Sequence, residues 1–447
     1  MTLEICKLLL FFFIGFYTFR WMKVNKCSQI LNFIFWLVFL RFVLAAFHEH
    51  TYPEILGPFS IISIYSVLLV CTSIVFMYLK NIPIMFTHRF YLIKALIFLM
   101  FVSSIVNSNL IQSVDSIFRW MFLLQLSTML IESIKYNGIV KVLKVISIAY
   151  LYPVILVIFS IVLGVSKATE IDGSISYVGG YYHEALISVL ILGAMSIFIL
   201  LVTEQGEKFK KLYLLTFFWF LLVMINYRTT LLASLFIGVF VLFAIYKNTQ
   251  IISNKIIMVL LVIMVTLVTT IFAPSDLFER FQEIPDAISQ YSHFLTLPEY
   301  YSEADQDFFS GRIYIWSTYI SGALDGTDIQ LFFGQGMNAW KERFSVYAHN
   351  TFVSFFYELG ILGLGIFSLL IVNGYRRILK IKKSDIALSL CGVYTAFVVL
   401  NFGTMPLWQV EGIILFSLII AITEYYVQSE NNEIEKQATY GAYTSVT

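Results

Sequence analysis

Charged side chains are scarce in this chain. Only 13% of its 447 residues are Asp, Glu, Lys or Arg, whereas 59% are hydrophobic. Soluble domains carry about 25% charged residues. This much apolar surface cannot be hidden in one core, so lipid must be the solvent for most of the chain. The formal net charge of +1 also excludes a nucleic-acid partner that is held by phosphate neutralisation.

Cysteine is also rare, and no two of the four cysteines form a Cys-x-x-Cys pair. The sequence therefore predicts neither a disulfide framework nor a zinc site. A cleavage site is missing as well. The first apolar run, residues 5–19, is followed by Arg20 and Lys23 rather than by small residues. We therefore expect a retained membrane segment and not a signal peptide.

Long apolar windows are what the chain does contain. Most are about 17 to 23 residues long, which suits a hydrocarbon core about 30 Å thick. Each must be a helix, because lipid cannot satisfy an open backbone. The sequence therefore predicts an all-α polytopic integral membrane protein with about 12–13 transmembrane helices. The windows are residues 5–19, 29–47, 58–79, 90–106, 110–131, 144–164, 185–202, 210–227, 229–246, 255–273, 350–372, 386–404 and 409–427.

Lysine and arginine predict the orientation of these helices. Alternate connections carry 18 of the 29 Lys and Arg residues, which predicts that these connections are cytoplasmic. An odd number of helices then places the N-terminus outside. The chain divides into transmembrane helices over 1–273, one large outward loop over 274–349, further transmembrane helices over 350–427 and a cytoplasmic tail over 428–447. The loop is acidic and rich in aromatic residues, so we expect interfacial helices in it rather than disorder.

Two arginines on the predicted outer side are candidate anion-binding residues. Arg228 stands between two apolar runs with almost no loop. It either extends to the lipid headgroups or uses its fork of N–H groups to bind phosphate oxygens. Arg312 opens an amphipathic stretch that includes Trp316 and is predicted to be an interfacial helix. A cation at a helix N-terminus opposes the helix dipole, which a bound anion would offset; the alternative is a partner among the loop's carboxylates.

His349 and Asn350 stand at the start of the apolar window 350–372. Asn is a good N-cap, so capping by itself accounts for Asn350. The helix dipole disfavours a charged His at this position, and a neutral imidazole is able to act as a general base. The alternative is an ordinary interfacial His. The turn Gly334-Gln335-Gly336 is a weaker candidate, because an ordinary turn by itself explains two glycines at this spacing.

Other charged residues within the apolar windows are predicted to be structural. Asp115 and Arg119 are four residues apart and are expected to neutralise each other. Arg41 and Lys94 are expected to form structural pairs or to extend to the headgroups. His183 and Glu184 follow an aromatic segment, where they are weaker candidates for binding sugar hydroxyls.

Several short motifs together resemble the O-antigen ligase and polymerase family of membrane glycosyltransferases. They are Tyr227-Arg228-Thr229, Ser310-Gly311-Arg312 with Trp316, Phe333-Gly334-Gln335-Gly336, His349-Asn350-Thr351-Phe352 and Glu358-Leu359-Gly360-Ile361-Leu362-Gly363. The resemblance covers roughly residues 210–372. It implies a GT-C-like fold in the bacterial inner membrane, with the active site on the large periplasmic loop side. It also implies a donor glycan on undecaprenyl diphosphate and no cofactor or metal.

The resemblance suggests roles for individual residues. Arg228 and Arg312 would bind the diphosphate, and His349 would act as the base or orient the acceptor hydroxyl. Asn350, Gly334, Gly336 and Trp316 would contact the substrate.

The function we expect is that of an O-antigen polymerase, because an acidic, aromatic loop suits the phosphorylated lipid A–core poorly. A chain-length regulator is a candidate partner. The O-antigen ligase is the close alternative. A lipid-linked oligosaccharide flippase is less expected, since a transporter predicts polar residues along a central cavity and no large one-sided loop.

Overall fold

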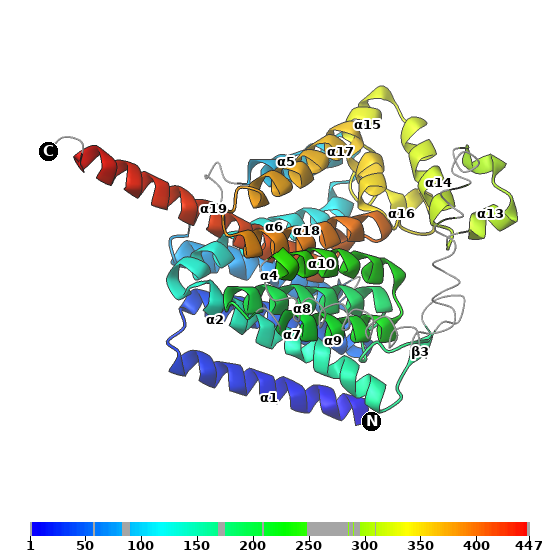
Figure 1. Cartoon of the computed structure of the whole chain (residues 1–447). Coiled ribbons are helices and arrows are strands. Elements are labelled where there is room, and N and C mark those ends of the chain that lie inside the picture. Colours follow the sequence, from blue (N-terminus) through cyan, green and yellow to red (C-terminus); the bar gives the residue numbers. More distant parts are fainter. Residues whose placement is uncertain are drawn as a thin grey trace.

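The chain forms a bundle of long helices with a smaller group of short helices at one end (Figure 1). The structure is a computed structural model that describes residues 2–56, 59–82, 90–168, 175–207, 210–247, 285, 289, 296–308 and 310–444. The long helices are α1 (Thr2–Val24), α2 (Gln29–Ala46), α4 (Ile61–Leu79), α5 (Tyr91–Val106), α6 (Leu110–Asn137), α7 (Ile139–Val162), α8 (Glu184–Glu204), α9 (Lys210–Ile225), α10 (Arg228–Lys247), α17 (Thr351–Ile378), α18 (Ser384–Gly403) and α19 (Val410–Thr444).

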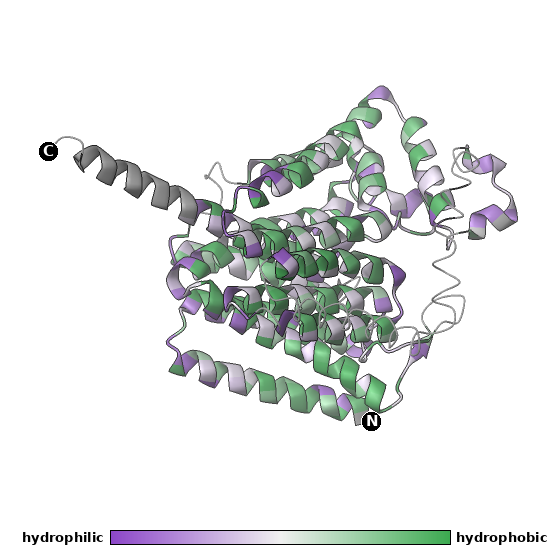
Figure 2. Cartoon of the chain, in the orientation of Figure 1, coloured by the Kyte–Doolittle hydropathy of each residue, from purple (hydrophilic) through white to green (hydrophobic). Residues whose placement is uncertain are grey.

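The prediction of an all-α polytopic membrane protein is confirmed. Among the described residues, ten helices are long and apolar enough to cross a membrane, and α5 is a shorter apolar helix. A helix coincides with every predicted window except residues 255–273, which lie outside the described residues. Hydrophobic residues follow the lengths of the helices, and hydrophilic residues gather near their ends (Figure 2).

Several helices extend beyond their apolar windows. The helix α6 continues to Asn137, α17 continues to Ile378, and α19 covers most of the predicted tail. The added turns of α6 and α17 carry charged residues such as Lys135 and Arg377. Hydropathy marks only the part of a helix that suits hydrocarbon, whereas the backbone hydrogen bonds continue into the polar layer.

Short elements occupy the connections. They are α3 (His48–Thr51), β1 (Glu54–Leu56), β2 (Phe59–Ser60), β3 (Lys167–Ala168), β4 (Ile175–Ser176), η1 (Pro298–Tyr300), α13 (Glu303–Asp307), α14 (Arg312–Leu324), α15 (Asp328–Phe333), α16 (Trp340–Arg343) and η2 (Pro406–Trp408). The strands form two antiparallel ribbons, β1 with β2 and β3 with β4.

Contacts group the connections at two ends of the bundle. At one end, Lys383 Nζ lies 3.1 Å from Glu204 Oε2. At the other end, Asn107 Nδ2 donates to the Gly334 carbonyl at 2.9 Å. The N-terminus and the loop helices α13, α14 and α16 share this second end, and the C-terminus lies at the first (Figure 1). Which of these two ends is cytoplasmic stays a prediction.

The helix α8 forms the centre of the bundle. Its span is 94% buried inside the protein, whereas the spans of α1 and α4 are only 33% and 22% buried. The helices α7, α9 and α18 pack against it. A peripheral helix such as α1 therefore presents most of its side chains outward, as expected where lipid replaces a protein neighbour.

Candidate active site

His349 is held between two fixed segments. On its N-terminal side, the Trp316 indole of α14 donates to the Ala348 carbonyl at 2.9 Å. On its C-terminal side, the Asn350 side chain caps α17 and accepts from the Phe352 and Val353 N–H groups at 2.9 and 3.2 Å. The loop helix and the membrane helix thus fix the position of the imidazole together.

The two predicted arginines lie at one junction between α10 and α14. Arg228 donates to the Ser310 hydroxyl, and Arg312 donates to the Thr229 hydroxyl at 3.0 Å. Among the residues that the structure describes, no carboxylate forms an ion pair with Arg312. The predicted alternative, a carboxylate partner from the loop, is therefore absent among these residues. The hydroxyl of Thr229 is neutral, so its contact does not compensate the charge of Arg312.

His349 is also electrostatically coupled to Arg312. Burial, followed by the positive charge of Arg312 and then by His183, lowers the pKa of His349 from 6.5 to about 4. The sequence predicted a neutral imidazole because of the helix dipole. The main cause of the lowered pKa is instead burial, because removal from water disfavours the charged form most. The ring also contacts the Tyr347 ring in a tilted arrangement, with 3.9 Å between the ring centroids.

Left-handed backbone marks each of these positions. Asn226, Ser310 and His349 have φ values of 58°, 53° and 51°, and none of them is a glycine. Such residues cost on the order of 1–3 kcal/mol each and persist where the surrounding structure imposes them, often at functional sites. The strained residues Asn226 and Ser310 stand two residues before Arg228 and Arg312, respectively. The third strained residue is His349 itself.

A cavity of about 590 Å³ opens beside His349. This volume is within the range of small-molecule sites, about 300–1,000 Å³. The segments that line it are parts of α2, α4, α6, α8 and α19, the residue after α3, the turn at η2 and the residues before α17. The lining residues are Arg41, Tyr52, Ile62, Ser63, Ser66, Asp115, Arg119, Tyr182, His183, Ala185, Leu186, Tyr347, His349, Trp408, Gln409, Val410 and Glu411.

The charges in this cavity are balanced. Arg41 Nε lies 2.8 Å from Glu411 Oε1, and Arg119 forms an ion pair with Asp115. The predicted structural pairing of Arg41, Asp115 and Arg119 is confirmed. The cavity therefore pairs each of its guanidinium groups with a carboxylate, and its other lining groups are hydroxyls, amides, imidazoles, aromatic rings and aliphatic side chains.

The two-glycine turn lies elsewhere. The Gln335 and Gly336 N–H groups donate to the Tyr357 and Glu358 carbonyls at 2.9 and 3.0 Å. These carbonyls are free because α17 is interrupted at Gly360, where φ is 67°. A side chain at Gly334 would collide with the backbone of Glu358. Close packing of the loop on α17 thus explains the glycines, and neither lines the cavity.

A comparison with family models agrees with this region of the chain. Residues 212–368, which contain Arg228, Arg312 and His349, match the model described as O-antigen ligase. This match, which covers residues 212–368 only, supports similarity to the O-antigen ligase and polymerase family. No curated protein matches the chain significantly. The family match indicates a function of the O-antigen ligase or polymerase type. Such a protein is a glycosyltransferase-like enzyme, and the apolar helices fit a multi-pass bacterial membrane protein.

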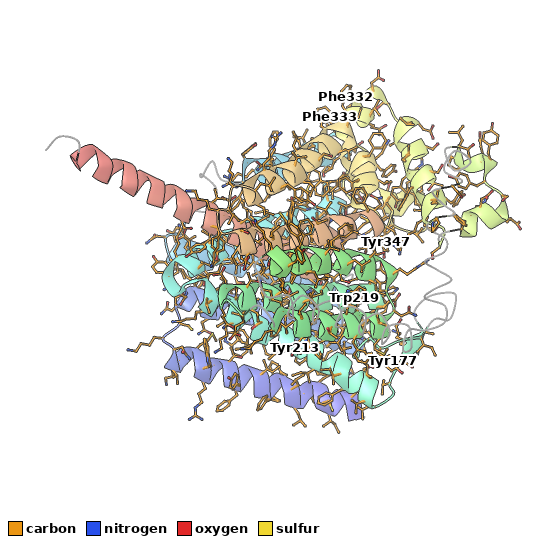
Figure 3. The ribbon with its side chains drawn as sticks, viewed as in Figure 1. Tyr177, Tyr213, Trp219, Phe332, Phe333 and Tyr347 are labelled. Atoms are coloured by element: carbon orange, nitrogen blue, oxygen red, sulfur yellow. The ribbon has the colours of Figure 1, made fainter. Side chains whose placement is uncertain are left out.

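The structure brings together only some of the residues predicted for this O-antigen ligase-type site. His349 lines the cavity and is electrostatically coupled to Arg312, and Arg228 lies with Arg312 at the junction of α10 and α14. Trp316 and Asn350 adjoin His349, but their hydrogen bonds hold the chain, so their contact with substrate stays a prediction. Figure 3 places Tyr347, two residues before His349 in the chain, well apart from Phe333, which begins the two-glycine turn.

Most lining residues of the cavity were not candidates from the sequence, and Trp408 and Gln409 are among them. They form the short turn between the last two helices, on the predicted outer side. The sequence signal for them was a Trp and a Gln side by side in a short turn on the predicted outer side, where both could contact a ligand. His183, a weak candidate, lines the cavity and caps α8, since its Nδ1 accepts from the Ala185 N–H at 3.1 Å.

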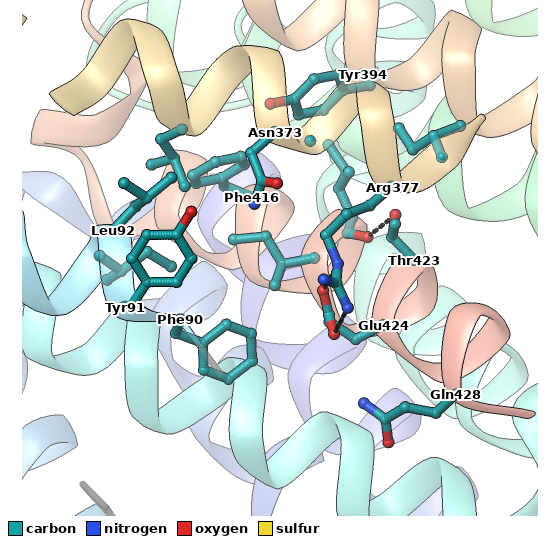
Figure 4. A pocket seen from close by; sticks show the side chains of 16 residues that line it. Phe90, Tyr91, Leu92, Asn373, Arg377, Tyr394, Phe416, Thr423, Glu424 and Gln428 are labelled. Carbon is teal, nitrogen blue, oxygen red and sulfur yellow. Dashed lines mark hydrogen bonds and ion pairs between the residues drawn. The ribbon is translucent and has the colours of Figure 1, made fainter. Parts of the chain in front are cut away.

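A second cavity, of about 360 Å³, lies among α5, α17, α18 and α19. Its guanidinium, Arg377, pairs with Glu424 (Figure 4). None of the predicted site residues lines it. It lies at the end of the bundle where α17 ends, away from His349.

Proposed function

We propose that the chain is an O-antigen polymerase of the inner membrane, with its active site on the periplasmic side. The donor is a glycan on undecaprenyl diphosphate, and the acceptor is the next lipid-linked repeat unit. One observation carries the proposal. His349 lines the charge-balanced aromatic cavity and is electrostatically coupled to Arg312, which has no carboxylate partner among the described residues. The arginine therefore suits a diphosphate, and the cavity suits a sugar.

The reaction needs few groups. An acceptor hydroxyl attacks the anomeric carbon, a new C–O bond forms, and the bond from that carbon to the phosphate oxygen breaks. The electron pair leaves with the lipid diphosphate, where Arg228 and Arg312 stabilise the developing charge. His349 receives the hydroxyl proton. The Nδ1 atom of His349 is buried and has no hydrogen-bond partner among the described residues, so it is available to an acceptor group.

The neutral cavity favours a polymerase over a ligase. A ligase accepts the phosphorylated lipid A–core, and burying phosphates would require uncompensated cations. The lining cations Arg41 and Arg119 are paired with Glu411 and Asp115. An uncharged repeat unit suits such a lining better. The ligase is the second candidate, because the matching family model carries that description.

The surface-glycan ladder of a host strain lacking this protein tests the proposal. Lipid A–core bearing a single repeat unit is the expected result, with the ladder restored by the wild-type protein but not by His349→Gln. Bare core with long glycan on undecaprenyl diphosphate would establish the ligase instead. An unchanged ladder would refute a role in this glycan.

We further propose that the reaction needs no metal, since arginines supply the positive charge at the diphosphate. Turnover by the purified protein should be unchanged after treatment with a chelator. Loss of activity that added Mg²⁺ restores would contradict this part of the proposal. A chain-length regulator remains a proposed partner, to be sought by co-purification.

A further inference from the structure

Three buried polar atoms on cavity-lining residues have no hydrogen-bond partner in the described part of the chain. They are His349 Nδ1, Trp408 Nε1 and Gln409 Oε1. Buried polar groups in proteins are almost always hydrogen-bonded, so each such group requires an explanation. His349 already has a proposed role in proton transfer, whereas Trp408 and Gln409 have none.

The turn that carries Trp408 and Gln409 is firmly held. The Trp408 carbonyl accepts from Arg119, and its ring packs on Phe355 with 5.1 Å between the centroids. The Trp408 and Gln409 N–H groups donate to Met405 and Pro406 carbonyls at 3.0 and 3.1 Å. The backbone of the turn is therefore fixed, and both residues line the cavity. A small rotation of either side chain would bring its unpartnered atom to a ligand there.

The chemistry of this wall suits an uncharged sugar. An indole N–H donates and an amide oxygen accepts, and a sugar hydroxyl does both. Tyr52, Tyr182 and Tyr347 provide aromatic surface in the same cavity, and the paired charges leave no free cation for an anion. The acceptor oxygen of Gln409 would repel a phosphate.

We propose that Trp408 and Gln409 bind hydroxyl groups of the glycan in this cavity and so select which sugar is accepted. This inference rests on the proposed function and adds two residues to the site. Selectivity follows because a buried donor or acceptor is left unpaired when the ligand lacks the matching hydroxyl, which disfavours that ligand strongly.

Binding to the purified full chain in lipid nanodiscs tests the inference. One probe is the undecaprenyl-diphosphate-linked glycan extracted from host cells that lack the protein, and the other is undecaprenyl diphosphate alone. Trp408→Phe keeps the ring and removes the N–H, and Gln409→Met keeps the length and removes the amide. We expect each variant to bind the glycan-bearing lipid about tenfold more weakly, equivalent to about 1.4 kcal/mol, and the bare lipid as wild type does.

Three controls separate the outcomes. Trp219→Phe, on α9 and outside the cavity lining, should bind both lipids normally. Arg312→Ala should lose affinity for both, because it acts on the diphosphate. Unchanged affinity of Trp408→Phe and Gln409→Met for the glycan-bearing lipid would overturn the inference alone. If wild type bound neither lipid, the proposed function would fail as well. Equal weakening toward both lipids would assign the turn a structural role and also overturn it.

Discussion

The coupling between Arg312 and His349 leads to a measurable change in a single pKa. The difference between the ordinary value of 6.5 and about 4 corresponds to roughly 3 kcal/mol against the imidazolium, at about 1.4 kcal/mol for each pH unit. Burial is the largest cause and Arg312 the second. Arg312→Gln should therefore recover less than half of this free energy, about 1 kcal/mol. The pKa of His349 should rise, but stay below 6.5.

The assay is NMR of the ¹³C-labelled histidine rings in the detergent-solubilised protein, titrated between pH 3.5 and 8. The chain has six histidines, and His349→Gln identifies the signal that belongs to His349. Arg376→Gln is the matched control, since Arg376 is exposed in the last turn of α17, remote from His349. It should leave the pKa unchanged.

A soluble diphosphate provides the second arm of this experiment. Farnesyl diphosphate should raise the pKa of His349 in the wild type, because its negative charge offsets Arg312 and attracts the imidazolium directly. The increase should be smaller in Arg312→Gln if the arginine holds the diphosphate. An ordinary pKa near 6.5 in the free wild-type protein, or no response to Arg312→Gln, would refute the electrostatic reasoning.

The remaining predictions concern stability and diphosphate recognition. Glu411→Gln leaves Arg41 without its carboxylate, so thermal unfolding should show a loss of about 3 kcal/mol. In Gly360→Ala, the alanine would stand at a disfavoured φ of 67° and its Cβ would collide with the Phe332 carbonyl. The folded yield on size-exclusion chromatography should therefore fall sharply. Gly365→Ala is the control and should be tolerated, because its Cβ would lie in open space. Arg312→Lys keeps the charge but loses the fork, so kcat/KM should fall about tenfold or more in a polymerisation assay; normal activity would exclude bidentate binding.

The helices could be predicted from the sequence because lipid imposes one solution on an apolar segment. A window such as residues 185–202 has to be a helix, and α8 occupies it with two further residues at its C-terminal end and one at its start. The interruption of α17 at Gly360 could not be predicted in this way. It depends on the turn at Gly334 docking from the loop, and the contact exists only after both segments have folded. From the sequence, Gly334 and Gly336 suggested contact with substrate. The packing of their turn against α17 accounts for both glycines without such a contact.

The candidate site was predictable to the extent that it used rare residues. Arg228, Arg312 and His349 attracted notice because charges are scarce and these three stood on the predicted outer side. Trp408 and Gln409 are ordinary residues in a short turn, and only the convergence of five helix ends makes their wall a cavity. Hydropathy and motif spacing contain no information on that convergence.

The electrostatic coupling between Arg312 and His349 leads to a prediction about the pH dependence of the reaction. In the proposed mechanism, burial and Arg312 keep His349 neutral before the donor arrives, so at neutral pH no solvent proton occupies the proposed base. A diphosphate that binds Arg312 raises the pKa of His349 and makes it a stronger base at the moment when the acceptor proton must be taken. The acid limb of kcat/KM reports the free protein and that of kcat reports the substrate complex. The limb for kcat should therefore lie at a higher pH than the limb for kcat/KM, whereas a base that acted independently of the diphosphate would place both at the same pH.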